Sequence, residues 1–145
     1  MILIYLKSFH NREKQTAIYA EIIETAVGRT REKVKIYPTD KSVGYCEIDT
    51  IKEIVPTLSI PETQQITVCT DEHQLAWDAE LIRKGEQPDF NSWKEFLDVL
   101  EQKKISTSKF KVKEGGMMSQ AEWAQARACL ARLAESHSEY GSFLR

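Results

Sequence analysis

The sequence predicts one α/β domain with a mixed five-stranded sheet, strands in the order 3-2-1-4-5 and helices on both faces. Three consecutive strand patterns open the chain and predict an antiparallel meander, whereas the later strands alternate with helices and require parallel crossovers. The length of 145 residues, with 41% hydrophobic and 29% charged residues, suits a single domain with a buried core. We expect the domain to span residues 1–136 and residues 137–145 to form a mobile C-terminal tail.

Apolar and β-branched runs define the predicted strands. The runs at residues 2–8 and 66–70 are almost continuously apolar, which is typical of buried central strands. Two other runs alternate apolar with basic side chains, which is typical of strands covered on one face. The predicted strands, of which the third and fifth are the sheet edges, are 2–8, 16–25, 31–37, 66–70 and 108–113.

Apolar residues at helical spacing predict four helices, at 43–55, 71–84, 92–103 and 119–135. Capping boxes open the last two of these helices: Ser92 with Glu95, and Ser119 with Glu122. In a capping box the two side chains satisfy free backbone N–H groups at the helix start, so these motifs predict where each helix begins.

The aromatic residues of the helices have a structural and a functional interpretation. Trp77, Trp93 and Trp123 fall at core-facing spacing, and we predict core packing for them rather than stacking on bases. His73 lies on a first helical turn, where we expect it to be exposed. No pair among the three histidines has metal-ligand spacing.

The cysteines and the net charge restrict the class of protein. Cys46, Cys69 and Cys129 lie within apolar patterns and form no C-x-x-C pair, which indicates reduced, buried thiols in a cytoplasmic protein. The opening apolar run ends at Lys7, too early for a signal peptide or a membrane span, so we expect no membrane partner. A net charge of −2 gives the whole molecule no strong attraction to nucleic acid, so any such site needs local clustering.

Four ordered stretches resemble the ribonuclease H family, as does the element order over most of residues 1–136. Ile-Thr-Val-Cys-Thr-Asp at 66–71 resembles the family's fourth strand, and Tyr-Cys-Glu-Ile at 45–48 resembles the start of its first helix. Lys-Val-Lys-Glu-Gly at 111–115 resembles the last strand and the glycine loop that follows it. Ala-Cys-Leu-Ala-Arg at 128–132 resembles the final helix. The resemblance implies the ribonuclease H fold.

The resemblance also implies a site, and this sequence matches only half of it. The family cleaves RNA paired with DNA by means of two Mg²⁺ ions held by four carboxylates. Asp71 and Glu47 match the strand-four and helix-one carboxylates and are the candidate catalytic and metal-binding residues. The strand-one position falls near Lys7, and residues 1–12 contain neither Asp nor Glu. The last-helix position falls on Ala128.

Each matching carboxylate also has a structural explanation, which we favour. An Asp between a strand and a helix, as at Asp71, is a good N-cap. An acid near the start of a helix, as at Glu47, is stabilised by the helix dipole and by solvent. Lys7 placed beside Asp71 would take the space and the charge of the first metal, as an internal counterion.

Lys109, Lys111 and Lys113 are the candidate nucleic-acid-binding residues, because basic side chains at period two on a strand match a phosphate backbone. Lysine on an edge strand is also ordinary protection against edge-to-edge pairing, and we favour that explanation. The stretch at 83–88 is short and mixed in charge, so the family's basic substrate-gripping protrusion is not expected here.

The function that the sequence favours is therefore that of a divergent, non-catalytic ribonuclease H-like domain that binds nucleic acid or a protein partner and needs no cofactor. The first alternative is a Mg²⁺-dependent ribonuclease H that cleaves RNA in RNA–DNA hybrids through Glu47 and Asp71. The second is a protein–protein scaffold subunit that docks through its edge strands. Candidate nucleic-acid partners are an RNA–DNA hybrid or a single strand.

Overall fold

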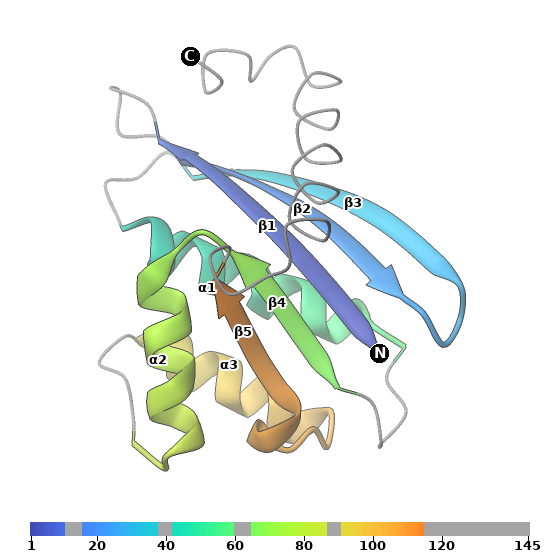
Figure 1. Ribbon diagram of the computed structural model, residues 1–145, viewed down its shortest axis with the longest axis vertical. Coiled ribbons are helices and arrows are strands. Elements are labelled where there is room, and N and C mark those ends of the chain that lie inside the picture. The colour runs from blue at the N-terminus through green and yellow to red at the C-terminus, as the bar shows by residue number, and fades with distance from the viewer. Residues whose placement is uncertain (11–15, 38–41, 60–64, 87–90, 115–145) are drawn as a thin grey trace.

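The computed structural model describes residues 1–10, 16–37, 42–59, 65–86 and 91–114. Its five strands form one mixed sheet in the order β3-β2-β1-β4-β5 (Figure 1), which confirms the predicted order and places β1 at the centre. The meander pairs β1–β2 and β2–β3 are antiparallel, and the pairs β1–β4 and β4–β5 are parallel. The strands are β1 Ile2–His10, β2 Thr16–Glu24, β3 Arg29–Tyr37, β4 Ile66–Thr70 and β5 Phe110–Glu114.

Three α-helices and two 3₁₀ turns connect the strands, at α1 Val43–Ile54, η1 Val55–Thr57, α2 His73–Arg83, α3 Asn91–Gln102 and η2 Thr107–Lys109. The Ser42 hydroxyl caps α1 by accepting a hydrogen bond from the Tyr45 backbone N–H at 3.2 Å. Pro56 lies in the η1 turn that follows α1, because proline has no N–H with which to continue an α-helix.

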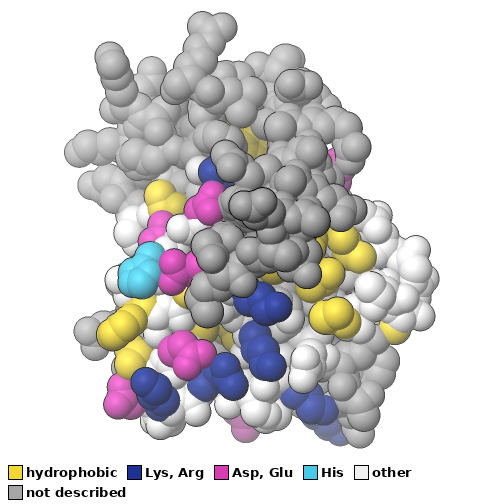
Figure 2. Space-filling view, viewed as in Figure 1, with side chains coloured by type: hydrophobic (Ala, Val, Ile, Leu, Met, Phe, Trp, Pro, Cys, Tyr) yellow, Lys and Arg dark blue, Asp and Glu magenta, His cyan; other side chains and the backbone are white. Residues whose placement is uncertain are grey.

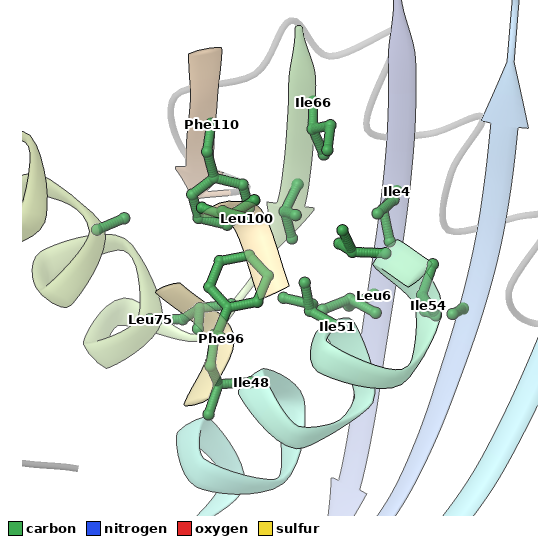
Figure 3. Packing of buried hydrophobic residues seen from close by; sticks show 14 of the residues in the cluster. Ile4, Leu6, Ile48, Ile51, Ile54, Ile66, Leu75, Phe96, Leu100 and Phe110 are labelled. Carbon is green, nitrogen blue, oxygen red and sulfur yellow. The ribbon is translucent and has the colours of Figure 1, made fainter. Parts of the chain in front are cut away.

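The main core lies between the sheet and the three described helices, all of which pack on one face of it (Figure 3). Ile4 and Leu6 of β1 are fully buried, and β4 continues this layer with Ile66. Phe96 of α3 packs edge-on against Phe110 of β5, with ring centroids 4.9 Å apart. The helix predicted at 119–135, Trp123, Cys129 and the domain boundary at residue 136 lie outside the described residues.

The start of α3 corrects one sequence prediction. The helix begins at Asn91, so Ser92 lies inside it and is buried instead of capping it. The Ser92 hydroxyl donates to Asp49 Oδ1 on α1 at 2.7 Å, and Glu95 pairs with Lys52, which is also on α1. The predicted capping box is wrong because tertiary contacts with α1 engage both of its side chains.

The edge strand β3 turns its basic side chains toward α1. Lys33 and Lys35 both pair with Glu53, Lys33 at 3.0 Å, and Arg31 donates to Thr57 Oγ1 at 2.5 Å. The register explains this orientation, because Lys33 is opposite the buried Ala20 of β2 and Lys35 is opposite Ile18. Charged pairs therefore replace apolar packing at this side of the helix layer.

The two described tryptophans differ in burial. Trp93 on α3 is 1% exposed, as predicted, and its Nε1–H donates to Asp78 Oδ2 at 3.0 Å. Trp77 on α2 is 58% exposed, so the prediction of core packing is wrong for it. The buried face of α2 carries Leu75 and Ala79, and Trp77 follows Leu75 by two residues, or about 200° around the helix.

Cys46 and Cys69 are buried, as predicted, and neither forms a disulfide bond with another described residue. Within the described part of the chain, no helix is long and apolar enough to cross a membrane.

Candidate functional site

A small pocket opens where β1 and β4 end. Because these two strands are parallel neighbours, their carboxyl ends meet at one edge of the sheet, next to the starts of α1 and α2. The pocket has a volume of about 200 Å³. Its lining brings both candidate carboxylates together with the lysine of the strand-one position: Lys7, Ser8, Val43, Glu47, Thr70, Asp71 and Glu72.

Glu47 is the buried acid of this pocket. Only 1% of the residue is exposed, so the expectation that solvent stabilises it is wrong. The Thr70 hydroxyl donates a hydrogen bond to Glu47 Oε1 at 2.5 Å. Burial, together with the nearby charges of Glu72 and Asp71, raises the pKa of Glu47 to about 8, against the lowering effect of the Thr70 hydrogen bond. Near neutral pH this carboxyl is therefore mostly protonated.

One oxygen of the same carboxyl remains unsatisfied. Glu47 Oε2 and Ser8 Oγ are both buried, and neither has a well-formed hydrogen bond within the described part of the chain. Ser8 nevertheless approaches the carboxyl closely enough to oppose the rise in the pKa of Glu47. A buried polar atom without a partner costs free energy, so this corner of the pocket suits a water molecule or a ligand donor.

Asp71 forms an ion pair instead of capping a helix. Lys7 Nζ lies 2.9 Å from Asp71 Oδ2, and the two side chains are 26% and 48% exposed. The N-cap of α2 is Glu72, whose side chain accepts from the Gln74 backbone N–H at 3.2 Å. The predicted N-cap role of Asp71 is therefore wrong, and the expected counterion position of Lys7 is observed.

The pocket does not fit two divalent ions. Glu47 is largely neutral near pH 7 and Asp71 already binds an ammonium group, so the pair supplies little free negative charge. Among the residues that the structure describes, no group of three or more His, Cys, Asp or Glu side chains is arranged to hold a metal ion. The ligand set therefore disagrees with the chemistry of the implied Mg²⁺ ions.

The second candidate site consists of Lys109, Lys111 and Lys113, of which Lys111 and Lys113 lie on β5, on the sheet face opposite the described helices. Lys109 lies in η2, so the prediction that the last strand begins at residue 108 is wrong. The register places Lys111 opposite Thr67 and Lys113 opposite Cys69 of β4. Lys113 is exposed, and it borders a second cavity of about 200 Å³ on this face. Figure 2 shows basic side chains gathered over the region of β5. The structure thus presents these lysines together, apart from the pocket of Glu47 and Asp71.

A side-chain hydrogen bond joins α2 to the end of β5. His73 Nδ1 lies 2.8 Å from Glu114 Oε1, and the His73 side chain is 73% exposed, as predicted. The imidazole also lies beside Trp77, with ring centroids 6.3 Å apart. Sequence reasoning missed Trp77 as an exposed residue, although the phase of Leu75, Ala79 and Ile82 places it on the outer face of α2.

The arrangement of elements is similar to that of solved ribonuclease H structures. No family model and no curated protein matches the chain. The N-terminal RNase H domain of Rv2228c from Mycobacterium tuberculosis superposes with a TM-score of 0.61 at 9% identity, over 97% of both chains. LC11-RNase H1 from compost, in complex with an RNA/DNA hybrid, superposes with a TM-score of 0.56 at 10% identity, over 91% of this chain and 95% of that one.

A viral protein gives a similar result. The prototype foamy virus protease-reverse transcriptase superposes with a TM-score of 0.61 at 14% identity, over 94% of this chain. This chain spans only 20% of the viral protein. Since all three identities are low, the similarity concerns the fold alone. The chain has the ribonuclease H-like fold, as its sequence resemblance implies.

Proposed function

We propose that this chain is a ribonuclease H-like domain that has no two-metal nuclease activity and that binds nucleic acid. The single observation that carries the proposal is the ion pair between Lys7 and Asp71, with 2.9 Å between Nζ and Oδ2. The resemblance implies a carboxylate at the strand-one position, and this sequence has a lysine there. A fixed positive charge therefore competes with any cation for Asp71.

Charge balance is the physical reason. Two divalent ions beside a scissile phosphate repel each other and need several carboxylates to hold them together. In this pocket Glu47 and Asp71 bring at most two negative charges, and Lys7 offsets one of them. The third acid of the lining, Glu72, caps α2 by accepting from the Gln74 backbone N–H. These residues therefore do not supply enough negative charge to hold the two ions that would stabilise the attacking and the leaving oxygens.

The β5 lysines support nucleic acid as the binding partner. Lys111 and Lys113 occupy alternate residues of β5, on the face away from the described helices, and Lys109 precedes the strand in η2. A strand rises about 3.3 Å per residue, so successive lysines are about 6.6 Å apart and can contact successive phosphates. A protein partner that adds a strand to the β5 edge is the other outcome of the binding test below.

One observation favours the alternative of an active ribonuclease H. Glu47 and Asp71, which are distant in sequence, line one pocket at the position of the family's site. In that case a further carboxylate from outside the described residues would have to complete the ligand set. The two functions make opposite predictions for hydrolysis.

The first test is hydrolysis of a labelled RNA–DNA hybrid with millimolar Mg²⁺ or Mn²⁺, for the wild type and Asp71→Asn. We expect no cleavage by either protein. Metal-dependent cleavage by the wild type that Asp71→Asn abolishes would refute the proposal and establish the enzyme. Cleavage that survives in Asp71→Asn would indicate a contaminating nuclease, and repurification would remove it.

The second test is titration of labelled hybrid, duplex and single strand at two salt concentrations. We expect an affinity that falls with salt, with a slope of log K against log salt of about −2 to −3 for three phosphate contacts. Combined substitution of Lys111 and Lys113 by alanine should flatten this slope by about 1 to 2. Lys94→Ala, which removes an exposed charge from α3, is the matched control and should leave it unchanged. Absence of binding at low salt would refute nucleic-acid binding.

A further inference from the structure

Trp77 is a large aromatic side chain that does not pack in the core. Its residue is 58% exposed, in contrast to Trp93, which is 1% exposed and hydrogen-bonded in the core. An indole ring in water costs hydrophobic free energy, and exposed tryptophans are enriched at binding surfaces. Its neighbour His73 is also exposed, so two rings lie side by side at the outer face of α2.

The geometry places Trp77 beside the β5 lysines. The hydrogen bond between His73 and Glu114 joins the start of α2 to the end of β5, and α2 then runs back along β5 (Figure 1). Four residues of helix span about 6 Å, as do two residues of strand. Trp77 is therefore level with the stretch of β5 that carries Lys111 and Lys113.

Both groups of side chains are accessible from one side of the molecule. Figure 2 shows hydrophobic side chains along the outer edge of α2 and basic side chains over β5 in the same view. Lys84, exposed at the end of α2, adds a further positive charge to this surface. We call the surface formed by His73, Trp77, Lys111 and Lys113 the α2–β5 surface.

We propose that the α2–β5 surface binds single-stranded nucleic acid, with an unpaired base stacked on Trp77 and the backbone phosphates on Lys111 and Lys113. The inference rests on the proposed function, since it requires that the domain bind nucleic acid at all. It goes further in naming the strand state of the ligand and the residue that selects it.

Stacking explains why the ligand is a single strand. In a duplex or a hybrid each base is already stacked between neighbours, and the grooves present only base edges. A base of a single strand offers its π face, and an exposed indole beside a row of cations is the combination that such a strand needs. Lysine charge attracts the strand regardless of sequence, whereas the indole discriminates between paired and unpaired bases.

Charge complementarity favours a polyanion over a protein as the occupant. Lys111, Lys113 and Lys84 bring three positive charges to the surface, and none of these lysines forms an ion pair with another described residue. Glu114 and Glu80, the nearby acids, are engaged with His73 and Arg83. A phosphate backbone would complement the lysines without displacing either pair.

The test compares binding of a labelled oligonucleotide as a single strand and as a duplex, for Trp77→Ala, Trp77→Phe and the wild type. We expect the wild type to prefer the single strand. Trp77→Ala should weaken single-strand binding by about 5- to 150-fold, the range of one base–aromatic stack, and leave duplex binding unchanged. Trp77→Phe keeps an aromatic face and should retain part of the affinity. Val27→Ala, at another exposed apolar position, is the control and should change nothing.

A spectroscopic measurement accompanies the titration. Stacking should quench the tryptophan emission of the wild type on addition of the single strand, and Trp77→Phe should lack that quenching. Salt-dependent binding that is equal for both ligands and indifferent to Trp77→Ala would overturn this inference and leave the proposed function standing. Absence of binding to any nucleic acid would overturn both. Because Trp77 is exposed, we expect the variants to fold, which circular dichroism checks.

Discussion

Lys7 on the central strand and Asp71 after β4 form an ion pair, with 2.9 Å between Nζ and Oδ2. It joins two parallel neighbouring strands at the mouth of the pocket that contains the buried Glu47. The local electrostatics are therefore those of a partly exposed salt bridge rather than of an acidic cation site.

The Lys7–Asp71 pair should contribute little to stability. Its side chains are 26% and 48% exposed, and pairs of this kind contribute about 0–1 kcal/mol. A double-mutant cycle with Lys7→Met and Asp71→Asn, measured by urea unfolding, should give a coupling free energy in that range. The coupling should decrease at high salt, because mobile ions screen exposed charges. A coupling above about 2 kcal/mol would mean that the pair is shielded from water.

Lys7→Asp should convert the pocket toward cation binding. The substitution replaces a positive charge with a carboxylate next to Asp71 and Glu47, which together with Glu72 gives four acids in the lining of one pocket. We expect Mn²⁺ to raise the melting temperature of Lys7→Asp more than that of the wild type. The unfolding free energy of Lys7→Asp should increase by about 1.4 kcal/mol when the free Mn²⁺ concentration is ten times its Kd. Lys7→Met is the control, and an equal Mn²⁺ effect on both variants would contradict the role of Lys7.

Glu47 should make the protein less stable as the pH rises. Its pKa in the folded state is about 8, well above the ordinary value of 4.5, so the folded state holds this proton more tightly than the unfolded state. The favourable contribution is complete below about pH 4.5 and is lost as the pH rises toward 8. The slope within this window should approach about 1 kcal/mol per pH unit.

Glu47→Gln isolates that effect. Glutamine keeps the shape of the side chain and an oxygen that accepts from Thr70, but it cannot ionise. From pH 5 to pH 8 the unfolding free energy of the wild type should fall relative to that of Glu47→Gln. Glu101→Gln, at an exposed position on α3, should show no such trend. A difference independent of pH would mean that Glu47 is ionised throughout.

Trp93→Phe should be more destabilising than Trp77→Phe. The first removes the Nε1–H that donates to the buried Asp78 at 3.0 Å and leaves that carboxylate oxygen without this donor, which costs about 1–3 kcal/mol. Trp77 is exposed, so its replacement should change stability by less than about 0.5 kcal/mol. Urea unfolding of both variants provides the measurement, and equal effects would contradict the burial difference.

The strand order could be predicted from sequence because local pattern and chain connectivity agree. The β-branched run Ile66–Thr70 is a strand over the predicted residues, and Pro38 and Pro56 follow the predicted ends of β3 and α1. Parallel crossovers then leave few topologies once the meander is recognised. Each of these patterns depends only on residues that are close in sequence, so it can be recognised without knowledge of tertiary contacts.

The environments of single side chains were harder to predict, because they depend on distant partners. Nothing near Ser92 in sequence indicates that Asp49 will accept its hydrogen bond. Glu47 is different, because Ile51 and Ile54 follow it by four and seven residues and so share its helix face. This position on the helix predicts burial of Glu47, but acidic side chains are usually exposed, so the sequence analysis placed it in solvent. Whether Lys7 reaches Asp71 depends on the register of β1 against β4, which the strand order alone does not fix.

The strand β3 has a consequence for how the domain opens. Lys33 and Lys35 attach it to α1 through Glu53, and all three side chains are about a third exposed. Such contacts are weak, and β3 has a hydrogen-bonded neighbour on one side only, whereas β1 is paired on both sides. Amide protons of β3 should therefore exchange with deuterium well before those of β1, without global unfolding. The centre of the sheet would then stay folded while β3 detaches. Detachment of β3 would expose the unpaired backbone of β2, where aggregation would begin.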